Sequence, residues 1–97
     1  MSNKHLTLLR SIFHDPISAN IHWREIESLL NHLGATVEPA HGARFRVVLN
    51  GVEGFLHHPH HSNECGKQDI KHVREVLAHA GISIARYEAM QHEAKDQ

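Results

Sequence analysis

Apolar residues recur every three or four positions in several stretches of the chain, which is the spacing of one helix face. This spacing predicts helices, which span residues 4–13, 22–33 and 67–80 and a short stretch that begins near Ile84. A glycine follows the last apolar residue of two of them, at Gly34 and Gly81, as expected where a helix ends in a left-handed residue. From Gln91 onward the chain is polar, and we expect it to fray.

A different spacing governs residues 44–57, where every second residue is apolar on either side of Asn50-Gly51. Asn-Gly favours a type I′ turn and therefore predicts a hairpin with a fixed register, in which Leu49 faces Val52 and Arg44 faces His57. One side of this hairpin is apolar and should be core, and it consists of Phe45, Val47, Leu49, Val52 and Leu56. The other side, which we call the open face, consists of Arg44, Arg46, Val48, Glu53, Phe55 and His57.

The order of these elements predicts an α+β fold, a two-layer sandwich with helices on one face of a three-stranded antiparallel sheet. Ala35 to Glu38 supplies the third strand, and Pro39 after it suits an edge position. Residues 62–66 are polar and are expected to form a loop. We divide the chain into an N-terminal helix and linker that are accessory (1–20), a central α-β-β-β-α domain (21–83), and a short C-terminal helix with its tail (84–97).

Length and composition exclude several classes of protein. The 97 residues suffice for one modest core, and no apolar run approaches the roughly 20 residues that span a bilayer. The first residues lack a secretion signal, and the single cysteine, Cys65, cannot form an internal disulfide and fits a reducing compartment. We therefore expect a cytoplasmic protein.

Positive charge is concentrated in the middle of the chain, although the formal net charge is only -1. Arg44 and Arg46 lie on the same side of one strand, where guanidinium groups can bind phosphate oxygens, and Phe55 beside them can stack a base. The same basic third contains Lys67 and Lys71, and we expect all five residues to bind RNA. The alternative is a solvated arginine that lies over an aromatic ring and has no ligand.

Histidines cluster after the hairpin, at positions 57, 58, 60 and 61, with Cys65 nearby. These residue types bind zinc, but His57 and His58 should point to opposite faces, and no second ligand pair is evident, so we expect no metal and no cofactor. Histidine can also act as general acid or base in RNA cleavage. Trp23 is expected in the core. Five further histidines are expected on exposed helix surfaces, namely His5, His14, His32, His79 and His92.

Several strings, in this order and at these separations, resemble the HicA family of bacterial toxins, small ribonucleases with a fold like that of double-stranded-RNA-binding domains. The strings lie within residues 21–83 and read REIESLLNHLGA, HGARFRVVLNG, LHHPH and KHVREVLAHAGIS. Where the family commonly has Gly-Ser-His with a catalytic histidine, this chain has Gly42-Ala43-Arg44. The resemblance therefore implies that the acid and base roles move to His57 or His41, with His60 matching the family's histidine after the third strand. The hairpin register favours His57, because it places His57 beside Arg44.

The resemblance thus implies a toxin that binds and cleaves mRNA and is inhibited by a HicB-like antitoxin, which we expect to cover the open face. We also expect that the protein does not enter a membrane. The alternatives are a non-catalytic module that binds RNA or a protein partner, which the arginine at position 44 favours, and a histidine-rich metal-binding protein.

Overall fold

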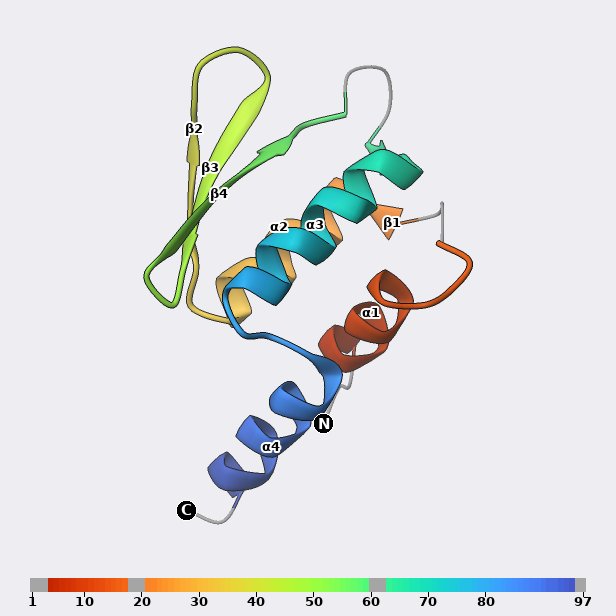
Figure 1. Ribbon diagram of the computed structural model, residues 1–97, viewed down its shortest axis with the longest axis vertical. Coiled ribbons are helices and arrows are strands. Elements are labelled where there is room, and N and C mark those ends of the chain that lie inside the picture. Colours follow the sequence, from red (N-terminus) through yellow and green to blue (C-terminus); the bar gives the residue numbers. More distant parts are fainter. Residues whose placement is uncertain (1–3, 18–20, 60–62, 96–97) are drawn as a thin grey trace.

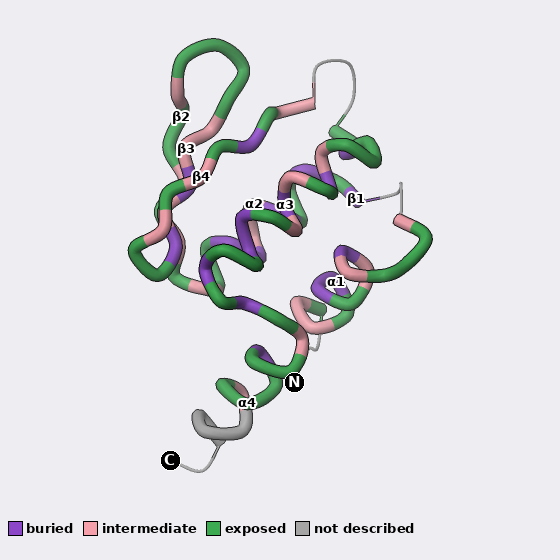
Figure 2. Tube along the Cα trace, in the orientation of Figure 1, coloured by how far each residue is buried: buried purple, intermediate pink, exposed green. Residues whose placement is uncertain are grey.

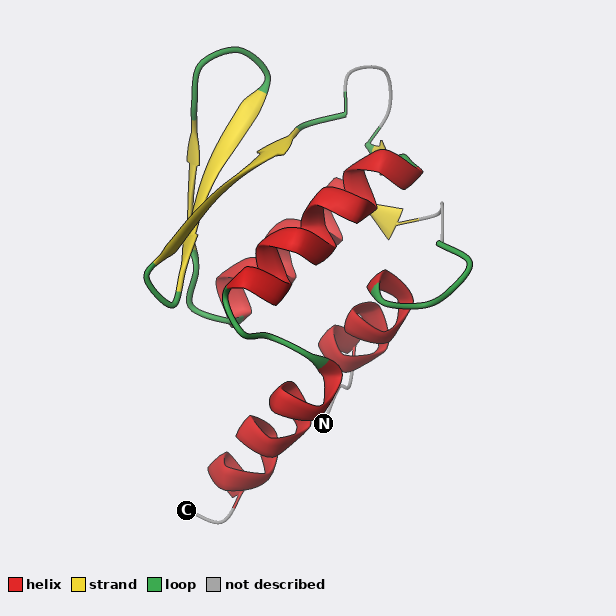
Figure 3. Ribbon diagram, in the orientation of Figure 1, coloured by secondary structure: helices red, strands yellow, loops and turns green. Residues whose placement is uncertain are grey.

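The computed structural model describes residues 4–17, 21–59 and 63–95 and shows a sheet covered on one face by helices (Figure 1). In chain order the elements are α1 (Lys4–Ile12), β1 (Ile21–His22), α2 (Trp23–His32), β2 (Thr36–Pro39), β3 (Arg44–Leu49), β4 (Val52–His57), β5 (Glu64–Cys65), α3 (Lys67–His79) and α4 (Ile84–Lys95). The α+β class, the three-stranded antiparallel sheet in the order β2-β3-β4 and the helical layer are confirmed (Figure 3).

The hairpin has the register that Asn50-Gly51 predicts, since Leu49 pairs with Val52 and Arg44 pairs with His57. Both turn residues have positive φ, 53° at Asn50 and 79° at Gly51, as a type I′ turn requires. Val47, Leu49 and Leu56 are at most 2% exposed on the core side. The open face is therefore set by the turn and the strand alternation together.

Helix α3 packs against β4 and helix α2 against β2, and each helix has a buried face that contributes to the core (Figure 2). Gly54 on β4 makes this approach possible, because a Cβ there would lie 2.8 Å from Cγ2 of Val76 on α3. Trp23 at the start of α2 is 4% exposed, as expected for a core residue. Its ring centroid lies 5.2 Å from that of Phe45 and 5.5 Å from that of His58.

Both core helices end at a glycine in the left-handed region, Gly34 after α2 and Gly81 after α3, as predicted. After α3 the amide of Gly81 donates to Ala78 and the next amide, of Ile82, donates to Leu77, which is the Schellman arrangement. The hairpin turn adds a contact here, since Nδ2 of Asn50 donates to the carbonyl of Ala80 at 2.9 Å. This bond joins the turn of the sheet to the end of α3.

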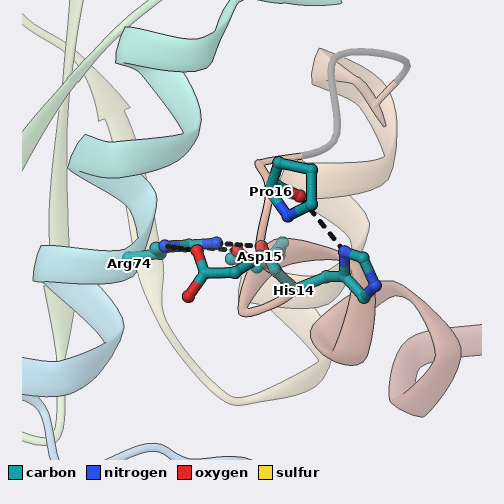
Figure 4. Close-up of polar contacts among 5 residues, drawn as sticks. His14, Asp15, Pro16 and Arg74 are labelled. Atoms are coloured by element: carbon teal, nitrogen blue, oxygen red, sulfur yellow. Dashed lines mark hydrogen bonds and ion pairs between the residues drawn. The ribbon is translucent and has the colours of Figure 1, made fainter.

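Helix α1, which we interpreted as accessory, buries Leu9 and Ile12 completely in the same core as the sheet residues. Arg74 on α3 holds the end of α1, donating to the carbonyls of Ile12 and His14 and lying 3.5 Å from a carboxylate oxygen of Asp15 (Figure 4). Buried apolar contacts and a half-buried guanidinium therefore both attach α1 to α3.

Two expectations about the less regular segments are wrong. Residues 64–65 form a strand instead of a loop, because Glu64–Cys65 pairs with Ile21–His22 and Asn63 accepts a hydrogen bond from the amide of Trp23 at 2.6 Å. The tail does not fray at Gln91, since α4 continues through Lys95 and carries the C-terminus away from the sheet (Figure 1).

A cluster of rings joins α1, α2 and α4, and it overturns the expectation that His5 lies on an exposed surface. The His5 ring stacks on His32 with 4.2 Å between centroids, and its Nε2 lies 3.1 Å from Oγ of Ser28. Nε2 of His32 in turn lies 2.9 Å from the Tyr87 hydroxyl. Burial, then the nearby His32 and Lys4, lowers the pKa of His5. His79 is exposed as expected, whereas the side chain of His92 lies outside the described residues.

Candidate nucleic-acid interface

Strand β2 adds a residue to the open face that the sequence analysis did not place there. It pairs with β3 so that Glu38 lies beside Arg46. The guanidinium of Arg46 donates to the carboxylate of Glu53 and lies 3.6 Å from the carboxylate of Glu38. The hydrogen bond and charge of Glu53, and the charge of Glu38, raise the pKa of Arg46. Arg46 can therefore bind a phosphate only by exchanging these carboxylates for it.

Unlike Arg46, Arg44 forms no ion pair with a carboxylate of the described residues. Its Nε donates to the carbonyl of His41 at 3.4 Å, and its guanidinium carbon lies 5.1 Å from the centre of the Phe55 ring. A guanidinium over a ring at this distance contributes about 0.5–1 kcal/mol at an exposed site. Phe55 is 43% exposed, so cation and ring remain accessible to a ligand.

A histidine that the sequence reasoning did not single out lies next to His57. The ring of His72 on α3 has its centroid 6.4 Å from that of His57, which is itself exposed opposite Arg44. His72 also lines a hollow of about 140 Å³ between β4 and α3, together with Phe55, Glu75 and His79. The edge of the sheet thus brings together two imidazoles, one guanidinium and one aromatic ring.

The signal that could have identified His72 is the spacing of His72, Glu75 and His79, which places three polar side chains along one flank of α3. Sequence spacing defines that flank but does not say whether it borders β4 or solvent. The close approach of α3 to Gly54 shows that this flank borders β4.

The remaining predicted residues lie apart from this group or outside the described residues. His41 is exposed in the bend before β3, where its carbonyl, rather than its ring, contacts Arg44. Lys67 and Lys71 are exposed one turn apart on α3, on the flank of Arg74 and Ala78 and away from His72. His60 lies outside the described residues.

Of the possible metal ligands beside His57, Cys65 is buried in the core and His58 is partly buried against it. His58 points away from His57, as expected, with its ring 6.0 Å from that of Phe45. Cys65 is 1% exposed, and burial, then nearby Asp69 and Glu25, raises its thiol pKa to about 11. Among the described residues, no three histidine, cysteine or acidic side chains gather into a group that could hold a metal ion.

Fold and site together define a small α+β domain whose sheet edge presents a cation, an aromatic ring and histidines at the surface. The family model described as HicA toxin of bacterial toxin-antitoxin matches residues 23–82. Since this match covers more than half of the chain, the protein belongs to the HicA toxin family. Searches of curated proteins and of solved structures found no match. In the part of the chain that the structure describes, every helix is too short or too polar to cross a membrane.

Proposed function

We propose that this toxin binds and cleaves mRNA at the edge of the open face, with His57 and His72 as the acid and base and Arg44 as the phosphate-binding group. The observation that carries the proposal is the approach of these two imidazole rings to 6.4 Å, beside an arginine that pairs with His57 across the hairpin. Cleavage at a 2′-hydroxyl needs one group to take a proton and another to donate one, and histidine performs both roles near neutral pH.

The groups beside the two imidazoles can also contribute to binding and cleavage. Arg44 can bind the phosphate that becomes more negative during attack, while Phe55 under its guanidinium can stack a base of a single-stranded RNA. No step in this scheme requires a metal ion or another cofactor. His41 and His60 remain further candidates for the same chemistry, and Arg46, Lys67 and Lys71 for binding the RNA backbone outside the site.

A HicB-like antitoxin is the proposed inhibitor, and it would act by covering the open face. Family membership supports the existence of an antitoxin partner. The exposed Phe55 and Arg44 suit such a contact, because aromatic and arginine side chains contribute most to protein interfaces.

Overproduction in bacteria tests the toxin function directly. We expect growth arrest and shortened transcripts, and we expect both to be relieved by His57→Ala combined with His60→Ala or with His72→Ala. His14→Ala serves as the control, because His14 is exposed after α1, lies outside the open face and the hollow beside it, and has no assigned role. If the double variants remained as toxic as the parent while folding normally, the site assignment would be wrong.

A second function, RNA binding without cleavage, is favoured by one observation, the arginine at the position where the family commonly has its catalytic histidine. In that case labelled RNA would shift in a gel and stay intact over hours, and its affinity would fall steeply as salt rises. Cleavage of the RNA by purified protein would exclude this alternative.

A further inference from the structure

Strand β4 is the exposed edge of the sheet, and its outward main-chain groups belong to three residues of the open face. In an antiparallel pair, alternate residues of a strand bond to the same neighbour. The amide of His58 donates to the carbonyl of Ala43 on the β3 side at 2.9 Å. Every second residue before His58 therefore bonds to β3, which leaves the N–H and C=O groups of Glu53, Phe55 and His57 directed away from it.

The two edges of the sheet differ in how they are protected. On the other edge β2 ends in Pro39, which has no N–H to donate, and proline is a common protection of edge strands. β4 contains no proline and no lysine. Within the described residues β3 is the only strand that pairs with β4, so no strand pairs with its outer edge, and the hollow that Phe55 and His72 line leaves space along it.

The three outward residues of one copy are complementary to the same three residues of a second copy when the two β4 strands run antiparallel. If a twofold axis passes through Phe55, then Phe55 lies opposite Phe55 of the second copy, and each Glu53 lies opposite a His57. All three residues then pair through their outward main-chain groups, and both ends join an acid to an imidazole that has Arg44 beside it. Shifting the axis to Glu53 would instead place the two Glu53 carboxylates opposite one another, and shifting it to His57 would leave Glu53 and Phe55 without these partners.

We propose that the chain forms a homodimer by antiparallel pairing of β4 with β4 of a second copy, which joins the two sheets into one. The pairing uses the same surface on both copies, as a closed twofold dimer requires. It places the two Phe55 side chains beside each other, where cross-strand aromatic pairs stabilise a sheet, and it places an acid opposite an imidazole at both ends. The proposal does not depend on RNA cleavage.

Cysteine cross-linking tests the register. Residues opposite one another in a hydrogen-bonded antiparallel pair have Cα atoms about 5.5 Å apart, within the roughly 4.4–6.8 Å that a disulfide spans. We expect Phe55→Cys to form a covalent dimer under mild oxidation, while Glu53→Cys forms one only when mixed with His57→Cys. The native Cys65 is 1% exposed and does not compete. If Glu53→Cys cross-links to itself as readily as Phe55→Cys, the register is wrong.

Charge exchange tests the same contact without oxidation, by sedimentation of tag-free full-length protein over a range of concentrations. Glu53→Lys alone and His57→Glu alone should each weaken self-association about tenfold or more, because each change acts twice in a twofold dimer. A mixture of the two variants should restore the dimer, since lysine then faces glutamate. Circular dichroism confirms that each variant is folded. A parent chain that remains monomeric up to submillimolar concentration would contradict the proposal, and this holds whether or not the protein cleaves RNA.

Discussion

At the scale of single residues, the neighbours of the two arginines on the open face determine which of them is available to bind a phosphate. Arg46 is engaged by Glu53 and Glu38, whereas Arg44 touches a main-chain carbonyl and the Phe55 ring. The sequence places both arginines on one side of one strand and makes them equivalent. The difference between them comes first from Glu53 on β4, which accepts a hydrogen bond from Arg46, and then from β2, whose register brings Glu38 to the open face.

Gly54 is the residue that sets the distance between the sheet and α3. Gly54→Ala should lower the free energy of unfolding by about 1–3 kcal/mol, because its Cβ would lie 2.8 Å from the stiff, branched side chain of Val76. Urea denaturation measures the effect. Val76→Ala should remove the clash, so the double variant should be less destabilised than the sum of the two single variants by about 1 kcal/mol. Additive effects would show that the two side chains do not meet.

At the scale of elements, local patterns predict the hairpin and the two core helices, because turn chemistry, alternation and helix ends act over a few neighbouring residues. The pairing of β1 with β5 has no such signal, since each strand is two residues long and exists only through the other. The length of α4 was also missed, because its apolar residues stop before the helix does. His72 was overlooked for a related reason, as its neighbours lie on another element.

The bond from Asn50 to the end of α3 yields a prediction for the hairpin turn. Asn50→Gly keeps the positive φ but loses the donor to the Ala80 carbonyl, and should cost about 1 kcal/mol of stability. Asn50→Ala also places an ordinary side chain in the left-handed region and should cost about 1–2 kcal/mol more. Urea midpoints of the two variants separate the contributions. A glycine variant as stable as the parent would show that the contact with α3 contributes nothing.

At the scale of the whole molecule, the terminal helices are fixed to the core by polar contacts as well as by burial. Arg74 holds the end of α1, while the stacked rings of His5 and His32 and the hydroxyl of Tyr87 connect α1, α2 and α4. The family match covers residues 23–82, so both outer helices lie beyond it. Their attachment sites on α2 and α3 nevertheless lie within it.

This ring cluster makes stability depend on pH. The pKa of His5 is lowered in the folded protein from its ordinary value of 6.5, so the unfolded chain takes up the proton first as the solution is acidified. The contribution of His5 is therefore complete above about pH 6.5 and is lost as pH falls through the lowered pKa. Denaturation at pH values on both sides of this range should show a smaller acid loss for His5→Gln than for the parent or for His79→Gln. Equal losses would contradict a role for His5.

The central claim is that the edge of the open face cleaves RNA, and single-turnover cleavage of a synthetic RNA by purified, tag-free protein tests it most directly. With a metal chelator present, we expect the parent to cut the RNA and leave a cyclic phosphate end. His57→Ala and His72→Ala should each be slower by about a hundredfold or more, and His14→Ala should match the parent. Intact RNA with the parent, or cutting by both site variants at the parental rate, would contradict the account.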